Sequence, residues 1–126
     1  TALQAASRRG NIDMVRLLLQ SGADVNILEG KCQTALRAAA CAKGHLEIVK
    51  TLLAHDANAE KVIHRSKTPL QVATEAGHLQ IVRALLAVGV DVNRSKGKFR
   101  TALSEASYRG NLSIAEQLLD SKASIS

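Results

Sequence analysis

A ten-residue stretch recurs four times at an almost constant interval, and this periodicity restricts the chain to repeat architectures. Each copy begins with threonine and ends with glycine: TALQAASRRG, TALRAAACAKG, TPLQVATEAG and TALSEASYRG. The threonines lie 33, 34 and 33 residues apart, so the second copy carries one extra residue. A unit of this length cannot bury a core by itself, so successive units must stack on one another.

Each unit contains two segments with helical periodicity. In the second segment apolar residues recur at intervals of three and four, as at Ile12, Val15, Leu18 and Leu19. The first segment is shorter and faces alanines inward, which lets two helices approach closely. The glycine that ends it stands where the first helix stops and the chain reverses, in a left-handed conformation that glycine adopts readily. Each unit is therefore predicted to be a helix hairpin.

Eleven residues separate each helix pair from the next, at 23–33, 57–67 and 90–100 (fingers one, two and three). They are polar, charged or β-branched and show no helical stripe, which predicts extended fingers or loops. The expected fold class is all-α, a solenoid of four stacked helix-turn-helix units with extended fingers. We expect a single domain over residues 1–126 with repeats at about 1–33, 34–67, 68–100 and 101–126. We also expect the domain to be a piece of a longer protein, because its first repeat lacks the polar signs of a cap.

The units resemble the ankyrin repeat over the whole chain. Three signatures carry this resemblance: TPL at 68–70, GHLEIV at 44–49 and GADVN at 22–26. The resemblance implies a non-catalytic scaffold that holds partners on a concave face, through its finger tips and the exposed ends of its first helices.

The sequence departs from the family pattern at positions that matter for the fingers. The family's histidine after TPL is replaced in all four repeats, by Gln4, Arg37, Gln71 and Ser104. We expect glutamine to take over part of that histidine's hydrogen bonding to the threonine and the finger backbone, and arginine not to. Finger two contains no glycine, so its tip is expected to differ from the family's hairpin. The extra residue of the second copy falls within 38–43, where we expect a longer turn rather than a helical bulge.

No motif for catalysis, a metal or a cofactor is found. Two histidines share one template position 33 residues apart, and the other two have no partner at metal-ligand spacing. Cys32 and Cys41 form neither a C-x-x-C motif nor a constellation with histidine, so we expect reduced thiols in an intracellular protein of the cytoplasm or nucleus. Phosphate-cradling loops, nucleophile elbows and zinc-protease motifs are absent. No apolar run reaches the roughly 18 residues of a membrane span. We therefore expect no enzyme, no cofactor, no metal and no membrane association.

Net charge is the compositional value that stands out, at +6 with an isoelectric point near 9.8. Finger one carries one cation and two acids, finger two three cations and one acid, and finger three four cations and one acid. Because the fingers stack side by side, these charges predict a basic edge towards the C-terminal half. A solubilising surface remains the alternative, but clustering by finger favours a binding role.

The resemblance places partner contacts on two sets of residues. In the fingers they are Leu28, Lys31, Gln33, His64, Arg65, Lys67, Lys98 and Arg100, and at the ends of the first helices Arg8, Arg9, Lys43, Glu75, Tyr108 and Arg109. The partner-binding set that we predict lies in repeats two to four: Arg65, Lys67, Arg94, Lys96, Lys98, Phe99, Arg100, Tyr108 and Arg109. Phe99 and Tyr108, each beside an arginine, have the composition of interface anchors. Packing of Phe99 between fingers is an equal alternative.

The favoured hypothesis is a monomeric domain that binds a protein or peptide partner with acidic segments. Nucleic-acid binding through the backbone is a weaker alternative, because stacking of single-stranded bases requires more aromatic residues than the chain has. A structural spacer in a multidomain protein is the third possibility.

Overall fold

In the computed structural model the described residues are 1–41, 43–60, 66–94 and 101–121, and they form eight helices without a named strand. The first helices of the four repeats are α1 (Ala2–Arg9), α3 (Ala35–Ala40), α5 (Pro69–Ala76) and α7 (Ala102–Arg109). The second helices are α2 (Ile12–Gln20), α4 (Leu46–Ala54), α6 (Leu79–Ala87) and α8 (Leu112–Asp120). The predicted all-α stack of four helix hairpins is confirmed.

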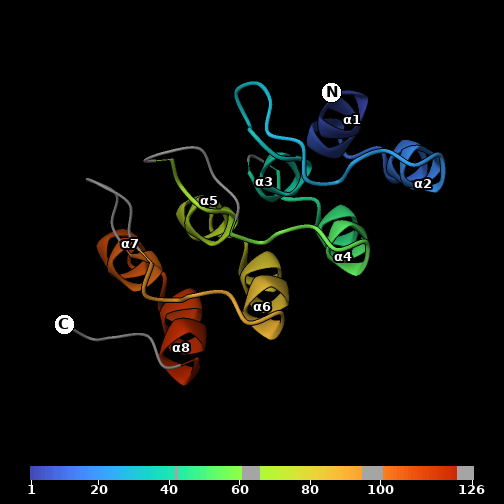
Figure 1. Ribbon diagram of the computed structural model, residues 1–126. Coiled ribbons are helices and arrows are strands. Elements are labelled where there is room, and N and C mark those ends of the chain that lie inside the picture. The colour runs from blue at the N-terminus through green and yellow to red at the C-terminus, as the bar shows by residue number, and fades with distance from the viewer. Residues whose placement is uncertain (42, 61–65, 95–100, 122–126) are drawn as a thin grey trace.

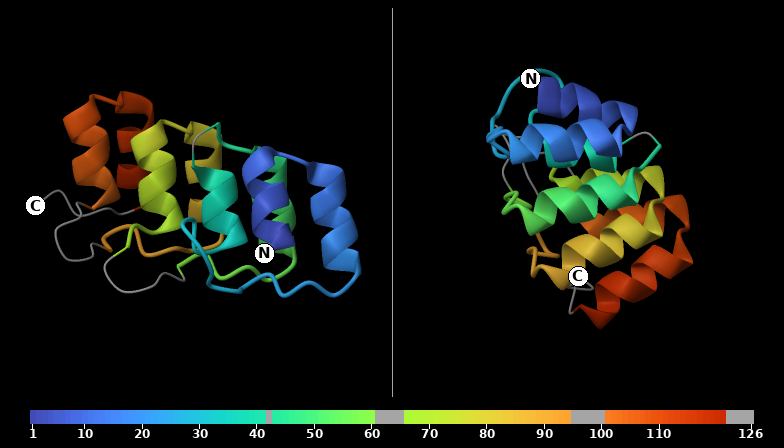
Figure 2. Two further views of the ribbon diagram at one scale, coloured as in Figure 1. Left: turned by 90° about the horizontal axis from the view of Figure 1, so that it is seen from above. Right: turned by 90° about the vertical axis from the view of Figure 1, so that its right-hand side faces the viewer.

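The two kinds of helix form two rows. Figure 1 shows the first helices in one row and the second helices in the other, in chain order. Figure 2 shows the hairpins stacked along one axis, with the connecting loops gathered on one side. Each first helix packs against the first helix of the next repeat and against its own second helix. The first helices thus present a continuous face, which we call the first-helix face, and the other row forms the second-helix face.

Each first helix begins at the threonine of its repeat. The threonine hydroxyl accepts a hydrogen bond from the backbone N–H three residues later, as Thr68 does from Gln71 at 3.2 Å. In α1 and α5 the side-chain oxygen of the glutamine also accepts a hydrogen bond from the backbone nitrogen of the threonine. This pair of bonds is a capping box. The recurring threonine therefore fixes the start of every first helix.

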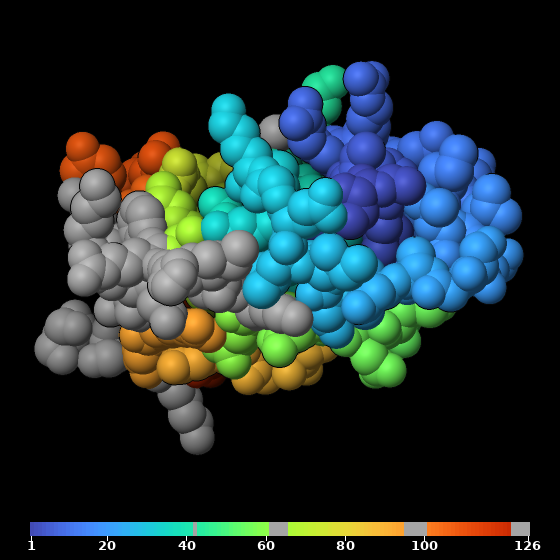
Figure 3. Space-filling model, turned by 45° about the horizontal axis from the view of Figure 1, so that its top comes forward, coloured from blue at the N-terminus to red at the C-terminus, as the bar shows by residue number. Residues whose placement is uncertain are grey.

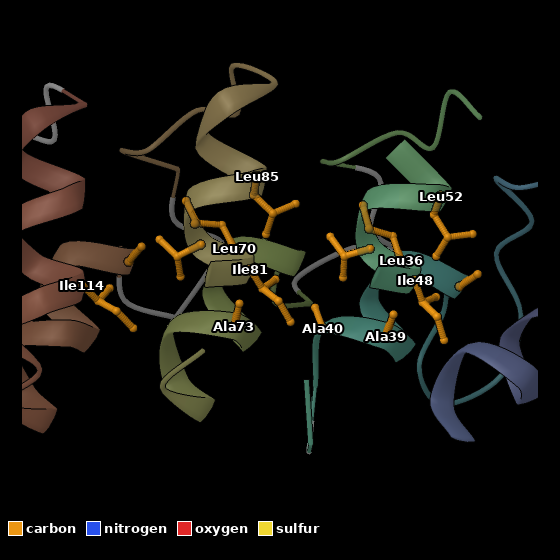
Figure 4. Packing of buried hydrophobic residues seen from close by; sticks show 14 of the residues in the cluster. Leu36, Ala39, Ala40, Ile48, Leu52, Leu70, Ala73, Ile81, Leu85 and Ile114 are labelled. Carbon is orange, nitrogen blue, oxygen red and sulfur yellow. The ribbon is translucent and has the colours of Figure 1, made fainter. Parts of the chain in front are cut away.

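The core is aliphatic and runs through the whole stack. Figure 4 shows Leu36, Ile48 and Leu52 gathered in repeat two and Leu70, Ile81 and Leu85 gathered in the same way in repeat three, and all six belong to one cluster of buried residues. These leucines and isoleucines are at most 3% exposed, so neighbouring repeats share one core. Alanines on the first helices, such as the fully buried Ala39 and Ala73, keep the two rows close.

The turn between first and second helix is closed in the same way in every repeat. The residue after the glycine donates its N–H to an alanine carbonyl of the first helix, as His78 does to Ala73 at 2.9 Å. In repeat two His45 bonds Ala39 at 2.8 Å, one residue further back than in the other repeats. The extra residue is therefore absorbed as a longer turn, as expected. Our expectation that this first helix runs up to Gly44 is wrong, since α3 ends at Ala40 and Cys41 is extended.

Two of these glycines, Gly10 and Gly44, are required by packing as well as by backbone conformation. The φ angles of Gly10 and Gly44 are 80° and 68°. A Cβ atom on Gly10 would lie 2.5 Å from the imidazole of His45, and one on Gly44 would lie 2.6 Å from that of His78. The His45 ring also makes a hydrogen bond at 3.1 Å with the carbonyl of Arg8. The histidine of each central repeat is thus seated on the turn of the repeat before it.

The fingers are held at their stems by side chains of the helices and of neighbouring fingers. Gln4 donates to the carbonyls of Ile27 and Gln33 at 3.2 and 2.7 Å, and Gln71 donates to that of Arg94 at 3.1 Å. Glutamine therefore performs the bonding to the finger backbone that we expected of it. Finger one closes through the Glu29 N–H and the Gln33 carbonyl at 2.8 Å. The tips of fingers two and three, with the expectation for finger two, lie outside the described residues.

Asp56 occupies a position where repeats one and three have glycine. Its φ is 66°, compared with 89° for Gly22 and 83° for Gly89, and its carboxylate makes no hydrogen bond or ion pair with the described residues. A left-handed conformation costs an L-residue energy that glycine avoids. The Asp56→Gly variant is expected to raise the free energy of unfolding by about 0.5–1 kcal/mol, measured by urea denaturation. The opposite substitution at the equivalent position of repeat one, Gly22→Asp, should lower the free energy of unfolding by a similar amount. A Cβ atom at Gly22 would meet no other atom within 4 Å, so only the backbone conformation is tested. Equal stability of all three proteins would contradict the assignment of strain to this turn.

Candidate binding surface

Four members of the predicted partner-binding set lie within the described residues: Lys67, Arg94, Tyr108 and Arg109. Lys67 stands just before α5, Arg94 at the stem of finger three, and Tyr108 and Arg109 at the end of α7. The other five are Arg65, Lys96, Lys98, Phe99 and Arg100, which lie outside the described residues. The four described residues belong to repeats two to four and lie along the first-helix face and its finger stems.

Arg94 has a structural role in joining two fingers. Its guanidinium Nη1 donates to the Glu60 carbonyl at 3.1 Å and lies 3.8 Å from the Glu60 carboxylate. The same carboxylate accepts the N–H of Asp91 at 3.0 Å. Only 26% of the Arg94 side chain is exposed. The contacts of Arg94 thus tie the stem of finger three to that of finger two.

A hollow of about 310 Å³ lies across three of the four first helices. We call it the central hollow, and its lining is Arg37, Cys41, Lys67, Val72, Glu75, Ala76 and Arg109. It brings together residues from α3, α5 and α7 that are up to 72 positions apart in the chain. The lining contains three cationic residues, Arg37, Lys67 and Arg109, and one acidic residue, Glu75.

Glu75 is the acidic residue of the central hollow and serves two cations. One carboxylate oxygen pairs with the Lys67 ammonium, and the other lies 4.0 Å from Nη2 of Arg109. Arg109 is itself bonded through Nε to Glu105 at 2.9 Å, and this bond raises the pKa of its guanidinium. These pairs extend from the stem of finger two to α7, so two of the predicted binding cations have carboxylate partners within the chain.

Arg37 differs from the other two cations of the hollow. Its side chain is half-buried, and Nη1 is buried without a hydrogen-bond partner among the described residues. No carboxylate of the described chain pairs with it. Arg37 was absent from the predicted binding set, although its place at the family's histidine position was the signal that marked it as unusual. A buried donor of this kind calls for an explanation.

A second hollow, of about 320 Å³, lies between α1 and finger one. We call it the N-terminal hollow, and its lining is Thr1, Gln4, Ala5, Arg8, Arg9, Glu29, Lys31 and Cys32. Arg8, Arg9 and Lys31 are exposed, and none of them is ion-paired within the described residues. Figure 3 shows finger one, in cyan, beside α1, in dark blue. The predicted set, centred on repeats two to four, left this end of the face out.

The comparison with protein families agrees with this architecture. The model of the family described as ankyrin repeats (3 copies) matches residues 1–63 and 39–126. The chain belongs to the ankyrin repeat family. Ankyrin repeats are generally non-catalytic modules for protein–protein interaction.

Two curated relatives from Oryza sativa subsp. japonica match parts of the ankyrin domain. "Probable E3 ubiquitin-protein ligase XBOS32" is 41% identical over 64 residues, which are 51% of this chain and 12% of the relative. "Probable E3 ubiquitin-protein ligase XBOS33" is 42% identical over 72 residues, which are 56% of this chain and 14% of the relative. The matched segment is thus a small part of each relative's length.

The two cysteines of the ankyrin domain are free thiols that lie near each other. Burial raises the pKa of the Cys41 thiol, and the neighbouring Cys32 thiol raises it further, while the charge of Arg37 acts in the opposite direction. The Cys41 thiol also donates to the Ala38 carbonyl at 3.4 Å. A raised pKa disfavours the thiolate, so Cys41 is a poor nucleophile and contributes to the wall of the central hollow.

The remaining features of the described chain show no site for chemistry. Tyr108 is 72% exposed on α7. No three histidine, cysteine, aspartate or glutamate side chains of the described residues gather as metal ligands. In the same part of the chain no helix has the length and apolar character needed to cross a bilayer.

Proposed function

We propose that this ankyrin domain is a non-catalytic module that binds an acidic segment of a partner protein on its first-helix face and finger tips. The proposal is supported by the charges of the two rows of helices, because the first helices are more basic than the second helices. The first helices carry four cations and two acids, whereas the second helices carry three cations and four acids. An acidic segment is therefore attracted to one face of the stack.

The two hollows carry the proposal. Each is lined by three cations and one acid, and each is open to solvent at the first-helix face. The net charge of the fingers rises from −1 in finger one to +2 in finger two and +3 in finger three. An extended acidic segment lying across the first helices would meet cations on α1, α3 and α7. The proposal includes a reducing intracellular setting, cytoplasm or nucleus, in which free thiols persist.

A charge-reversal experiment tests the proposal. The probe is a fluorescein-labelled deca-glutamate peptide, titrated with the domain at physiological salt. The triple variant Lys96→Glu, Lys98→Glu, Arg100→Glu is expected to weaken binding at least about tenfold, because it reverses the charge of the most basic finger. The control is Arg16→Glu, Lys50→Glu, Arg83→Glu on the second helices, which lowers the net charge equally and whose binding should stay within about twofold of wild type.

Two outcomes would contradict the proposal. Equal weakening by both triple variants would mean that net charge, and not this face, attracts the peptide. Tighter retention of a labelled random duplex than of the peptide at physiological salt would instead favour nucleic-acid binding through the phosphate backbone.

A further inference from the structure

The central hollow contains a carboxylate that belongs to the chain itself. Glu75 lies on α5 between Lys67, at the end of finger two, and Arg109, on α7, and it is paired with both. The side chain of Glu75 is 36% exposed, so it is accessible from the open side of the hollow. The carboxylate holds Arg109 only loosely, because its oxygen and Nη2 are 4.0 Å apart, which is longer than a hydrogen bond.

The charges of the hollow leave one cation in excess. The lining holds three cations, Arg37, Lys67 and Arg109, together with Glu75. Glu105 is not part of the lining but is paired with Arg109. Three cations and two acids give a net charge of +1, with Arg37 as the cation that no acid of the described chain neutralises. One further carboxylate would bring the cluster to neutrality.

The shape of the hollow fits an acidic side chain. Its volume of about 310 Å³ is ample for one aspartate or glutamate, and Val72 and Ala76 provide an apolar wall for methylene groups. Arg37 belongs to this lining, and its Nη1 is buried with no hydrogen-bond partner among the described residues. An arginine fork is well suited to a carboxylate, which it can bind with two parallel hydrogen bonds.

On the basis of the proposed function above, we propose that the central hollow is the subsite for one acidic side chain of the partner, and that Glu75 competes with that side chain for Lys67 and Arg109. Arg37 provides the positive charge that the internal carboxylate leaves unmatched. Binding at this subsite is therefore held back by a residue of the domain itself, and removal of its charge increases affinity.

The test measures affinity for the labelled deca-glutamate peptide at physiological salt. Glu75→Gln preserves size and removes the competing charge, and it is expected to tighten binding about fivefold. Arg37→Gln is expected to weaken binding about fivefold, and Arg37→Lys, which keeps the charge without the fork, to have an intermediate effect. The Arg37→Lys variant keeps the test informative if Arg37→Gln fails to fold, which circular dichroism will reveal.

Matched controls lie on the second-helix face. Glu116→Gln on α8 and Arg83→Gln on α6 make the same charge changes at exposed residues outside the hollow, and each should leave affinity within about twofold. In NMR spectra, addition of the peptide should shift the methyl signals of Val72 and Ala76. In the Glu75→Gln variant these shifts should saturate at a lower peptide concentration.

The results separate this inference from the proposed function. If Glu75→Gln binds no more tightly than wild type, or only as much more tightly as Glu116→Gln, the subsite is overturned, while the proposed function stands on the finger-three variant. If wild type does not bind the peptide, the proposed function falls. In that case, binding of the peptide by the Glu75→Gln variant would still support the subsite. Absence of binding by this variant would overturn the subsite together with the proposed function.

Discussion

Replacing Gly44 by alanine is expected to lower the free energy of unfolding by about 3 kcal/mol. Two effects combine at this position. The φ of 68° is unfavourable for any residue with a Cβ atom, and the added Cβ would lie 2.6 Å from the imidazole of His78 in the next repeat. The contacted atoms include Cγ of His78, which lies close to the backbone, so relief of the contact requires a shift between repeats two and three. Urea denaturation followed by circular dichroism at 222 nm measures the loss.

Gly110 provides the matched control for Gly44. Its φ of 69° is almost the same, but a Cβ there would meet nothing within 4 Å. Gly110→Ala should therefore lose only the conformational part, about 1 kcal/mol. If the two variants lost the same stability, close packing of histidine on the turn would not contribute, and the backbone angle alone would explain the glycine.

Truncation of Leu85 to alanine is expected to lower the free energy of unfolding at least as much as Gly44→Ala. Leu85 is fully buried on α6 and belongs to the core that runs through the stack, so Leu85→Ala leaves a cavity in the middle of the stack. We expect a loss of about 3–4 kcal/mol in the free energy of unfolding. Because the repeats share one core, the loss should appear as a lower midpoint of a single transition.

The control for Leu85 is the same substitution on another second helix. Leu17 on α2 is 55% exposed, and Leu17→Ala should cost less than about 1 kcal/mol. Similar losses for both variants would mean that apolar surface, and not burial in the shared core, determines stability. A separate early transition in Leu85→Ala would show that the two halves of the stack unfold independently.

The architecture was predictable from the sequence because every repeat carries the same signals. The threonine caps, the glycine turns and the apolar intervals recur four times, and each agrees with the others. The early end of α3 was not predictable, because one extra residue can be accommodated at several places between Ala38 and Gly44. The choice depends on keeping the bond from His45 to Ala39, which is visible only in three dimensions.

The candidate site was less accessible to sequence analysis than the fold. A charge tally by finger treats each cation alike, whereas Lys67 and Arg109 share Glu75, and Arg94 is engaged with Glu60. Such pairs join residues from neighbouring repeats, and no periodic pattern reveals them. The importance of Arg37 follows from burial, which the sequence marks only as a departure from the family's histidine.

The finger stems suggest how this domain can change partners without losing its structure. Asn26 reaches the next finger at the Asp56 carbonyl and the Asn58 N–H, at 3.1 and 2.7 Å, and Glu60 makes the corresponding bond to Asp91 at 3.0 Å. These bonds lie near the base of each finger, outside the 61–65 and 95–100 segments. Substitutions in those segments leave the bonds between stems intact. Recognition can therefore evolve at one set of positions while a different set preserves the stack.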